Sequence, residues 1–187
     1  IAMVVDYDGD ADNQVMVKAL VAIGRQFDMF TVAESVERPE DADWLVEAGV
    51  DWIQLRDREL DGQDWLDWAT GIARAARALR PEIEIIVNRR VDIALAIEAT
   101  GVHLGFDAMA PSDAREILGR ESRIGASLHS ASEVVPAADS ELDYGHLAPI
   151  FDPLSKKPER PALGLAPLQQ ASERGIPILA QGGITRV

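Results

Sequence analysis

The chain has 187 residues, of which 47% are hydrophobic and 5% aromatic, and its formal net charge is −14 at pH 7. This length suits one domain with a sizeable core, while the acidic excess argues against nonspecific nucleic-acid binding, which needs clustered Lys and Arg. The absence of cysteine excludes disulfides, thiol nucleophiles and cysteine-based metal sites. Because no apolar stretch approaches the roughly 20 residues that span a bilayer and no signal peptide opens the chain, we expect a cytoplasmic protein.

Short apolar strands alternate with helical patterns along the chain. In chain order the expected strands are 1–7, 29–35, 51–57, 83–89, 101–105, 123–129, 144–151 and 176–183. The expected helices between them are 12–27, 39–48, 62–80, 90–99, 111–119, 131–138 and 164–174. The pattern is clearest in helix 62–80, where one face carries Trp65, Trp68, Ala69, Ile72, Ala73, Ala76 and Leu79.

Such alternation predicts parallel strands joined by right-handed crossovers. Eight strands can close into a (βα)8 barrel of the TIM type, which leaves no sheet edge exposed. That count requires the first strand to pair with the last. An open doubly wound sheet is the alternative, but it would leave apolar edges that nothing in the sequence protects. We therefore expect a single barrel domain over residues 1–187, short enough to lack one outer helix.

Five segments between residues 48 and 185 follow one family pattern. They are DWIQLRDREL, IIVNRRVDIALAIEATGVHLG, RIGASLHSASEV, DYGHLAPIFDPLSKK and GIPILAQGGIT, in that order. Together they resemble the thiamine phosphate synthase and TenI (thiazole tautomerase) superfamily. This resemblance implies a barrel that binds phosphate or a phosphorylated thiazole.

The opening of the chain has a different resemblance. In residues 1–54, VAESVE and GVDWIQ occur in an order similar to the C-terminal half of EAL domains, which are cyclic-di-GMP phosphodiesterase barrels. The two resemblances meet at AGVDWIQ, which predicts a chimera with an EAL-like segment 1–50 and a thiamine phosphate synthase/TenI-like segment 51–187. A natural, divergent homologue is the alternative. We expect an engineered barrel with a partial phosphate site and no efficient catalysis. Although Glu34 and Gln54 fall on EAL site positions, the rest of that metal site is missing, so cyclic-di-GMP hydrolysis is not expected.

The thiamine phosphate synthase resemblance also implies substrate-binding positions at the ends of strands, where barrels carry their functional residues. These positions are Gln54, Arg56, Asn88, Ser127, Ser155, Lys156, Gly182 and Gly183. Two neighbours depart from the family pattern, since Arg58 replaces a lysine and Pro153 replaces a threonine. The free backbone amides of the GGI turn at Gly182 and Gly183 can bind phosphate.

The implied metal site departs further from the family. Its two metal-binding aspartates fall on Arg89 and Ala108, with Asp107 one position away. Mg²⁺ prefers hard oxygen ligands, so we expect neither a metal nor another cofactor, and Mg²⁺-dependent synthesis suits this chain poorly.

The stretch VVDYDGDAD stands where the family completes its phosphate site. Its Asp6, Asp8 and Asp10 would repel a phosphate, and we interpret it as a solvated loop that caps the following helix at Asp12. Weak cation binding by the first three aspartates is the alternative.

Thiazole tautomerase activity is the alternative function, because it needs proton transfer but no metal. His129 aligns with the acid–base histidine of the tautomerase branch, and histidine titrates in a useful pH range. A packed or surface role for His129 stays open. His103 and His146 lie inside apolar strands, and for these we expect a structural role.

Overall fold

The computed structural model describes residues 2–6, 11–57, 59–60, 62–105, 107–134, 141–152 and 160–183. Its strands are β1 (Ala2–Asp6), β2 (Phe30–Val36), β3 (Trp52–Leu55), β4 (Glu84–Asn88), β5 (Gly101–Leu104), β6 (Arg123–Leu128), β7 (Tyr144–Leu147) and β8 (Ile178–Ala180). The α-helices are α1 (Ala11–Gln26), α2 (Pro39–Ala48), α3 (Gly62–Leu79), α4 (Val91–Ala96), α5 (Pro111–Leu118) and α6 (Leu165–Ser172). The predicted alternation of strands and helices is confirmed.

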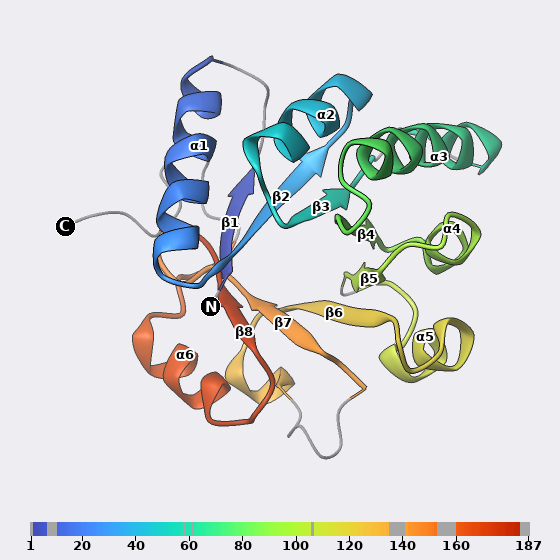
Figure 1. Ribbon diagram of the computed structural model, residues 1–187. Helices are drawn as coiled ribbons and strands as arrows, with labels where there is room; N and C mark the ends of the chain where they lie inside the picture. Colours follow the sequence, from blue (N-terminus) through green and yellow to red (C-terminus); the bar gives the residue numbers. More distant parts are fainter. Residues whose placement is uncertain are drawn as a thin grey trace.

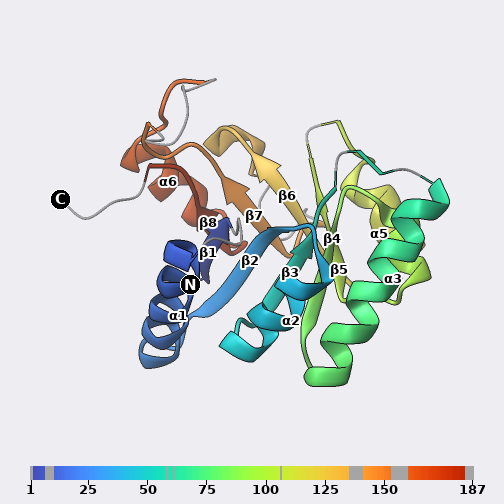
Figure 2. The ribbon, with the colours of Figure 1, turned by 90° about the horizontal axis from the view of Figure 1, so that it is seen from above.

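All these strands belong to one parallel sheet whose spatial order is the order of the chain, β1 to β8. A doubly wound sheet reverses its strand order at a switch point, so that alternative is wrong. The sheet curls until β8 returns toward β1, with the helices on the outside (Figures 1 and 2). Cα atoms of β1 and β8 come within 8 Å of each other. Among the described residues, however, no hydrogen-bonded ladder joins these two strands, so the parallel α/β architecture is established and closure of the barrel is not.

The connection between β6 and β7 differs from the prediction. In place of a helix from residue 131, the chain forms a single 3-10 turn, η1 (Ala131–Glu133), and residues 135–140 lie outside the described part. The Glu133 carboxylate accepts hydrogen bonds from the backbone N–H of His129 at 2.8 Å and from the Ser130 hydroxyl at 3.0 Å. Such local side-chain bonds compete with helix propagation, which explains why the turn does not extend.

The outer helices bury the predicted apolar stripes. On α3 the buried residues are Trp65, Ala69, Ile72, Ala73 and Ala76, which confirms the periodicity argument. Two members of the predicted stripe differ: Trp68 is only partly buried, and Leu79, which ends the helix, is 49% exposed. Arg77 in the last turn of α3 donates hydrogen bonds to the carbonyls of Ile97 and Glu98, which ties α3 to the end of α4.

The amino end of the curled sheet is filled by side chains. An apolar layer inside the sheet consists of Val32, Trp52, Ile86, Tyr144 and Leu179. Next to it, Arg123 makes a two-pronged ion pair with Glu84, at 2.7 and 2.9 Å, and lies 5.4 Å from the ring centre of Trp52. A functional space is therefore expected at the carboxyl end of the strands, where TIM-type barrels carry their sites.

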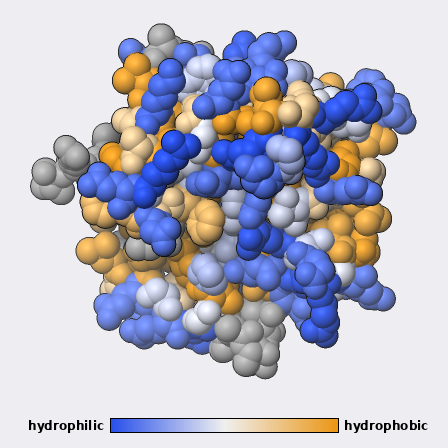
Figure 3. Space-filling view, in the orientation of Figure 1, coloured by the Kyte–Doolittle hydropathy of each residue, from blue (hydrophilic) through white to orange (hydrophobic). Residues whose placement is uncertain are grey.

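The surface is mixed in character. Hydrophilic side chains cover much of the face seen in Figure 3, and apolar groups are interspersed among them. No helix in the described part of the chain is long and apolar enough to cross a membrane.

Candidate functional site

A polar layer lies inside the sheet, above the apolar layer and toward the carboxyl ends of the strands. It is built from Glu34 on β2, His103 on β5, Ser127 on β6, His146 on β7 and Gln181 just after β8. Because side chains alternate between the two faces of a strand, His146 points to the same interior as Tyr144. Both histidine side chains are almost completely buried, at 2% and 3% exposure.

The first part of this layer centres on His103. Its Nε2 lies 2.9 Å from the Ser127 hydroxyl and its Nδ1 lies 3.4 Å from the Tyr144 hydroxyl. Burial, followed by the electrostatic influence of His146 and Arg56, holds the pKa of His103 well below its usual value. A neutral imidazole donates through one nitrogen and accepts through the other. The His103 ring therefore links the hydroxyl groups of Tyr144 and Ser127 and orients the Ser127 hydroxyl.

The second part of the layer is a carboxylate–histidine pair. Glu34 Oε1 lies 3.1 Å from His146 Nδ1 and accepts a 3.1 Å hydrogen bond from the side-chain amide of Gln181. With Nδ1 committed to Glu34, the other nitrogen of His146, Nε2, is buried and has no hydrogen-bond partner among the described residues. A buried polar atom of this kind calls for a partner, so the interior can offer one hydrogen-bonding group to a ligand.

The low pKa of His103 predicts a pH-dependent stability. In the folded protein His103 stays neutral, whereas in the unfolded chain it takes up a proton as the pH falls below about 6.5. The unfolded state then binds more protons, so we expect His103 to lower the free energy of unfolding by about 1.4 kcal/mol per pH unit below that value. Urea denaturation of the wild type and of His103→Gln, from about pH 7.5 to about pH 5.5, measures this. Equal pH slopes for the two proteins would contradict the assignment.

His129 follows β6 at the carboxyl end of the sheet and is half-buried. Its Nδ1 lies 3.1 Å from the carbonyl oxygen of Ala148. A carbonyl can only accept, so Nδ1 carries a proton, and in the neutral ring Nε2 is the nitrogen that can accept. Ala148 stands two residues after His146 on the carboxyl side of β7, so His129 lies toward the carboxyl end of the sheet from the buried pair.

The remaining predicted positions are distributed around the same end. Gln54 on β3 is buried, and Arg56 and Asn88 at the ends of β3 and β4 are half-buried. The charge of Arg56 acts on His103, which shows that it is near the polar layer. Ser155 and Lys156 lie outside the described residues.

Gly182 and Gly183 form the turn after β8. Their φ angles are 89° and 62°, a left-handed conformation that only glycine adopts without strain. A Cβ on Gly183 would come within 2.5 Å of the Asp152 carbonyl oxygen, and the backbone of residues 150–151 is hydrogen-bonded to the turn. The turn thus packs against the loop after β7, which agrees with the phosphate-turn prediction but does not test it.

The side chains at the predicted metal positions do not suit a metal. Arg89 stands at the end of β4, and its guanidinium is 2.6 Å from Asp107 Oδ2. This cation already neutralises the nearest carboxylate and would repel a divalent ion. Within the described ranges, no group of three His, Asp or Glu side chains could hold a metal ion, so a Mg²⁺ site of the kind implied by the family does not fit these residues.

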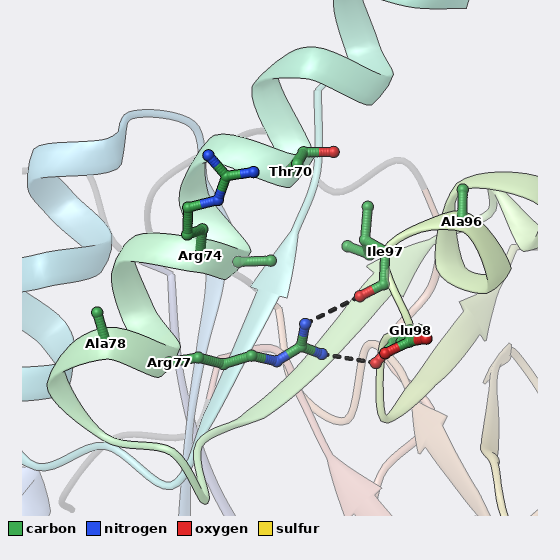
Figure 4. Close-up of a pocket in the computed structure, with 8 residues that line it drawn as sticks. Thr70, Arg74, Arg77, Ala78, Ala96, Ile97 and Glu98 are labelled. Atoms are coloured by element: carbon green, nitrogen blue, oxygen red, sulfur yellow. Dashed lines mark hydrogen bonds between the residues drawn. The ribbon is translucent and has the colours of Figure 1, made fainter.

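A surface groove of about 460 Å³ between α3 and α4 is a separate feature. Figure 4 shows Arg77 reaching across it to the carbonyls of Ile97 and Glu98, while Arg74 and Thr70 lie along α3. The groove is on the helical exterior, away from the carboxyl ends of the strands. It is therefore no candidate for the catalytic site.

Reasoning from the sequence missed the contacts of the polar layer. His103 and His146 were expected to be structural, and Tyr144 and Gln181 were not considered. A usable signal existed, since polar residues recur at alternate positions in strands that are buried on both faces. Which of them meet depended on the stagger between strands, which the sequence does not show.

The parallel curled sheet, with a polar interior at the carboxyl ends of its strands, defines an α/β barrel-type protein with an enzyme-like site. Residues 29–187 match the family described as thiamine monophosphate synthase, TMP-TENI. The chain belongs to this family.

Comparisons with individual proteins support the same family. The chain is 38% identical over 143 residues to a thiamine-phosphate synthase of Chlorobium phaeobacteroides, and 39% identical over 137 residues to one of Halalkalibacterium halodurans. These matches cover 76% and 73% of the chain but only 68% and 64% of the relatives. A solved structure, thiamine phosphate pyrophosphorylase from Pyrococcus furiosus, is similar with a TM-score of 0.67 and 29% identity, covering 82% of this chain and 74% of that one.

These findings overturn the expectation of an engineered chimera without efficient catalysis. The family match runs without a break from residue 29, so it includes the VAESVE strand that suggested an EAL segment, and it passes through the supposed junction. The EAL resemblance was misleading because a helix ending in Ala-Gly before an apolar strand recurs wherever βα units repeat. The chain is a member of one natural enzyme family.

Proposed function

We propose that the protein is a thiamine-biosynthesis enzyme that isomerises a phosphorylated thiazole by proton transfer. In this reaction one ring C–H bond breaks, the proton passes to His129 Nε2, and it returns to another carbon of the same substrate as the ring becomes aromatic. No electrons are gained or lost and no metal is needed. The observation that carries the proposal is the 3.1 Å contact of His129 Nδ1 with the Ala148 carbonyl, which leaves Nε2 as a proton acceptor.

The polar layer supports this assignment. Hydrogen-bonding groups lie deeper in the interior than His129. They are the Ser127 hydroxyl, which His103 orients, and the Glu34–His146 pair. We retain the predicted substrate-binding positions as part of the proposal: Gln54, Arg56, Asn88, Ser127, Ser155, Lys156, Gly182 and Gly183. The substrate's phosphate is assigned to the turn at Gly182 and Gly183, whose left-handed glycines suit anion binding by backbone amides.

Thiamine phosphate synthesis is the second candidate, because the relatives carry that name. Against it stands the cation Arg89 at one of the positions where that reaction's metal would be held. We rank it below proton transfer for this reason.

Two assays decide between the candidates. The chain is incubated with the non-aromatic thiazole carboxylate phosphate in the presence of EDTA, and the aromatic product is followed by proton NMR. In parallel, formation of thiamine phosphate from the pyrimidine diphosphate and the thiazole phosphate is measured with Mg²⁺. We expect turnover in the first assay; turnover only in the second would overthrow the proposal.

We also infer that the fold is a closed eight-stranded barrel, with β1 beside β8. The family match starts at residue 29 and contains β2 to β8, so β1 and α1 occupy the space of the one remaining βα unit. The approach of β1 and β8 supports this. Amide hydrogen exchange tests it: slow exchange is expected in both strands, whereas an open edge would exchange rapidly.

A further inference from the structure

The backbone at the end of β4 holds Arg89 in an unusual conformation. Its φ is 65°, a left-handed conformation that costs a non-glycine residue roughly 1–3 kcal/mol. Its backbone N–H donates a 2.8 Å hydrogen bond to the His103 carbonyl, which extends the β4–β5 pairing beyond Asn88. The direction of the Arg89 side chain is thus set by the sheet.

The side chain is held as well. Its guanidinium is 2.6 Å from Asp107 Oδ2, and its aliphatic part lies over Gly105, where an added Cβ would sit 3.8 Å from its Cγ and Cδ. An exposed ion pair of this kind contributes little stability and does not offset the backbone cost by itself. Binding of an anionic ligand would explain why the Arg89 guanidinium is held in place at the carboxyl end of the sheet.

The Arg89 guanidinium has N–H donors that Asp107 does not use. Arginine carries five N–H groups, and within the described residues only one hydrogen bond is recorded for the Arg89 guanidinium, to Asp107. The side chain is 51% exposed, so the remaining donors are accessible from solvent. Neighbouring Arg90 differs, since its Nε and one terminal nitrogen bind both carboxylate oxygens of Asp92 at 2.9 and 2.7 Å.

We propose that Arg89, clamped by Asp107, binds a phosphoryl group of the ligand and supplies the positive charge that a metal ion would otherwise provide. Guanidinium groups match phosphate geometry and form strong charge-assisted hydrogen bonds. In a chain with a net charge of −14, a local cation is needed to attract an anion. The proposal goes beyond the proposed function, because it assigns a second anion position at the end of β4, separate from the turn at Gly182 and Gly183 to which the thiazole phosphate is assigned.

The test is calorimetric titration of the whole chain with inorganic pyrophosphate, and separately with inorganic phosphate, in EDTA. We expect wild-type binding without metal and a loss of roughly 10- to 100-fold in affinity for Arg89→Gln, the range for one hydrogen bond to a charged group. Arg90→Gln is the matched control, with the same change of charge at the adjacent residue, and should bind within about 2-fold of the wild type. Tighter binding of pyrophosphate than of phosphate would indicate that the Arg89 position takes a diphosphate, and equal binding that it takes a single phosphoryl group.

A second variant tests the metal argument directly. Arg89→Asp combined with Ala108→Asp introduces two oxygen ligands beside Asp107, and pyrophosphate binding should then require Mg²⁺. The proposal is overturned if the wild type binds pyrophosphate only with Mg²⁺, or if Arg89→Gln and Arg90→Gln behave alike. Failure of this inference can be told apart from failure of the proposed function. If the thiazole is turned over and Arg89→Gln is unimpaired, only the assignment of Arg89 is wrong. If pyrophosphate binds through Arg89 but the thiazole is not turned over, only the proposed reaction is wrong.

Discussion

Replacing His129 with alanine is expected to lower kcat for the thiazole isomerisation by about 100- to 10,000-fold, the usual contribution of one positioned acid–base group. The imidazole is half-buried and rests on the Ala148 carbonyl, so its loss removes the proton acceptor without opening the core. The melting temperature should change little. Turnover followed by proton NMR, together with thermal denaturation of the same samples, measures both quantities.

The neighbouring Ser130→Ala is a suitable control. The Ser130 hydroxyl bonds to Glu133 at 3.0 Å in the same turn but has no assigned chemical role, so activity within a few-fold of the wild type is expected. Equal activity of His129→Ala and wild type would remove His129 from the mechanism. Equal losses in both variants would mean that the turn, and not the imidazole, matters.

Gly101→Ala should destabilise the fold by about 3 kcal/mol or more, at the upper end of overpacking effects. Gly101 begins β5 and pairs with Arg123 of β6. A Cβ there would overlap the backbone carbonyl of Arg123 and lie 2.8 Å from its Cβ. Backbone in the middle of a sheet cannot move aside as a flexible side chain can, so the strands must separate. Urea denaturation gives the change in the free energy of unfolding.

Gly71→Ala provides the opposite case. Gly71 is an exposed residue within α3, and nothing lies within 4 Å of a Cβ added to it. Alanine should stabilise the helix by about 0.5–1 kcal/mol. If both substitutions destabilise the protein to a similar extent, the close contact at Gly101 is not the cause.

The errors of the sequence reasoning have a common origin. The VAESVE strand and the AGVD helix end were assigned to a second family, although they belong to one continuous match from residue 29. Both are generic βα features, set by local helix termination and strand burial, and they carry little family information. The helix predicted from residue 131 is replaced at its start by a 3-10 turn for a local reason too, since the Glu133 carboxylate accepts hydrogen bonds from residues 129 and 130.

Periodicity, turn residues and strand–helix alternation, all readable in the sequence, were enough to determine the parallel α/β architecture, because they reflect local backbone preferences and one-sided burial. The same holds for the strand-end positions of Arg56, Asn88 and His129. Only the tertiary structure decided that His103 meets Ser127, that Glu34 pairs with His146 and that Arg89 pairs with Asp107. These pairs join residues 18 to 112 positions apart, and the curl and stagger of the sheet, which no local pattern encodes, bring them into contact.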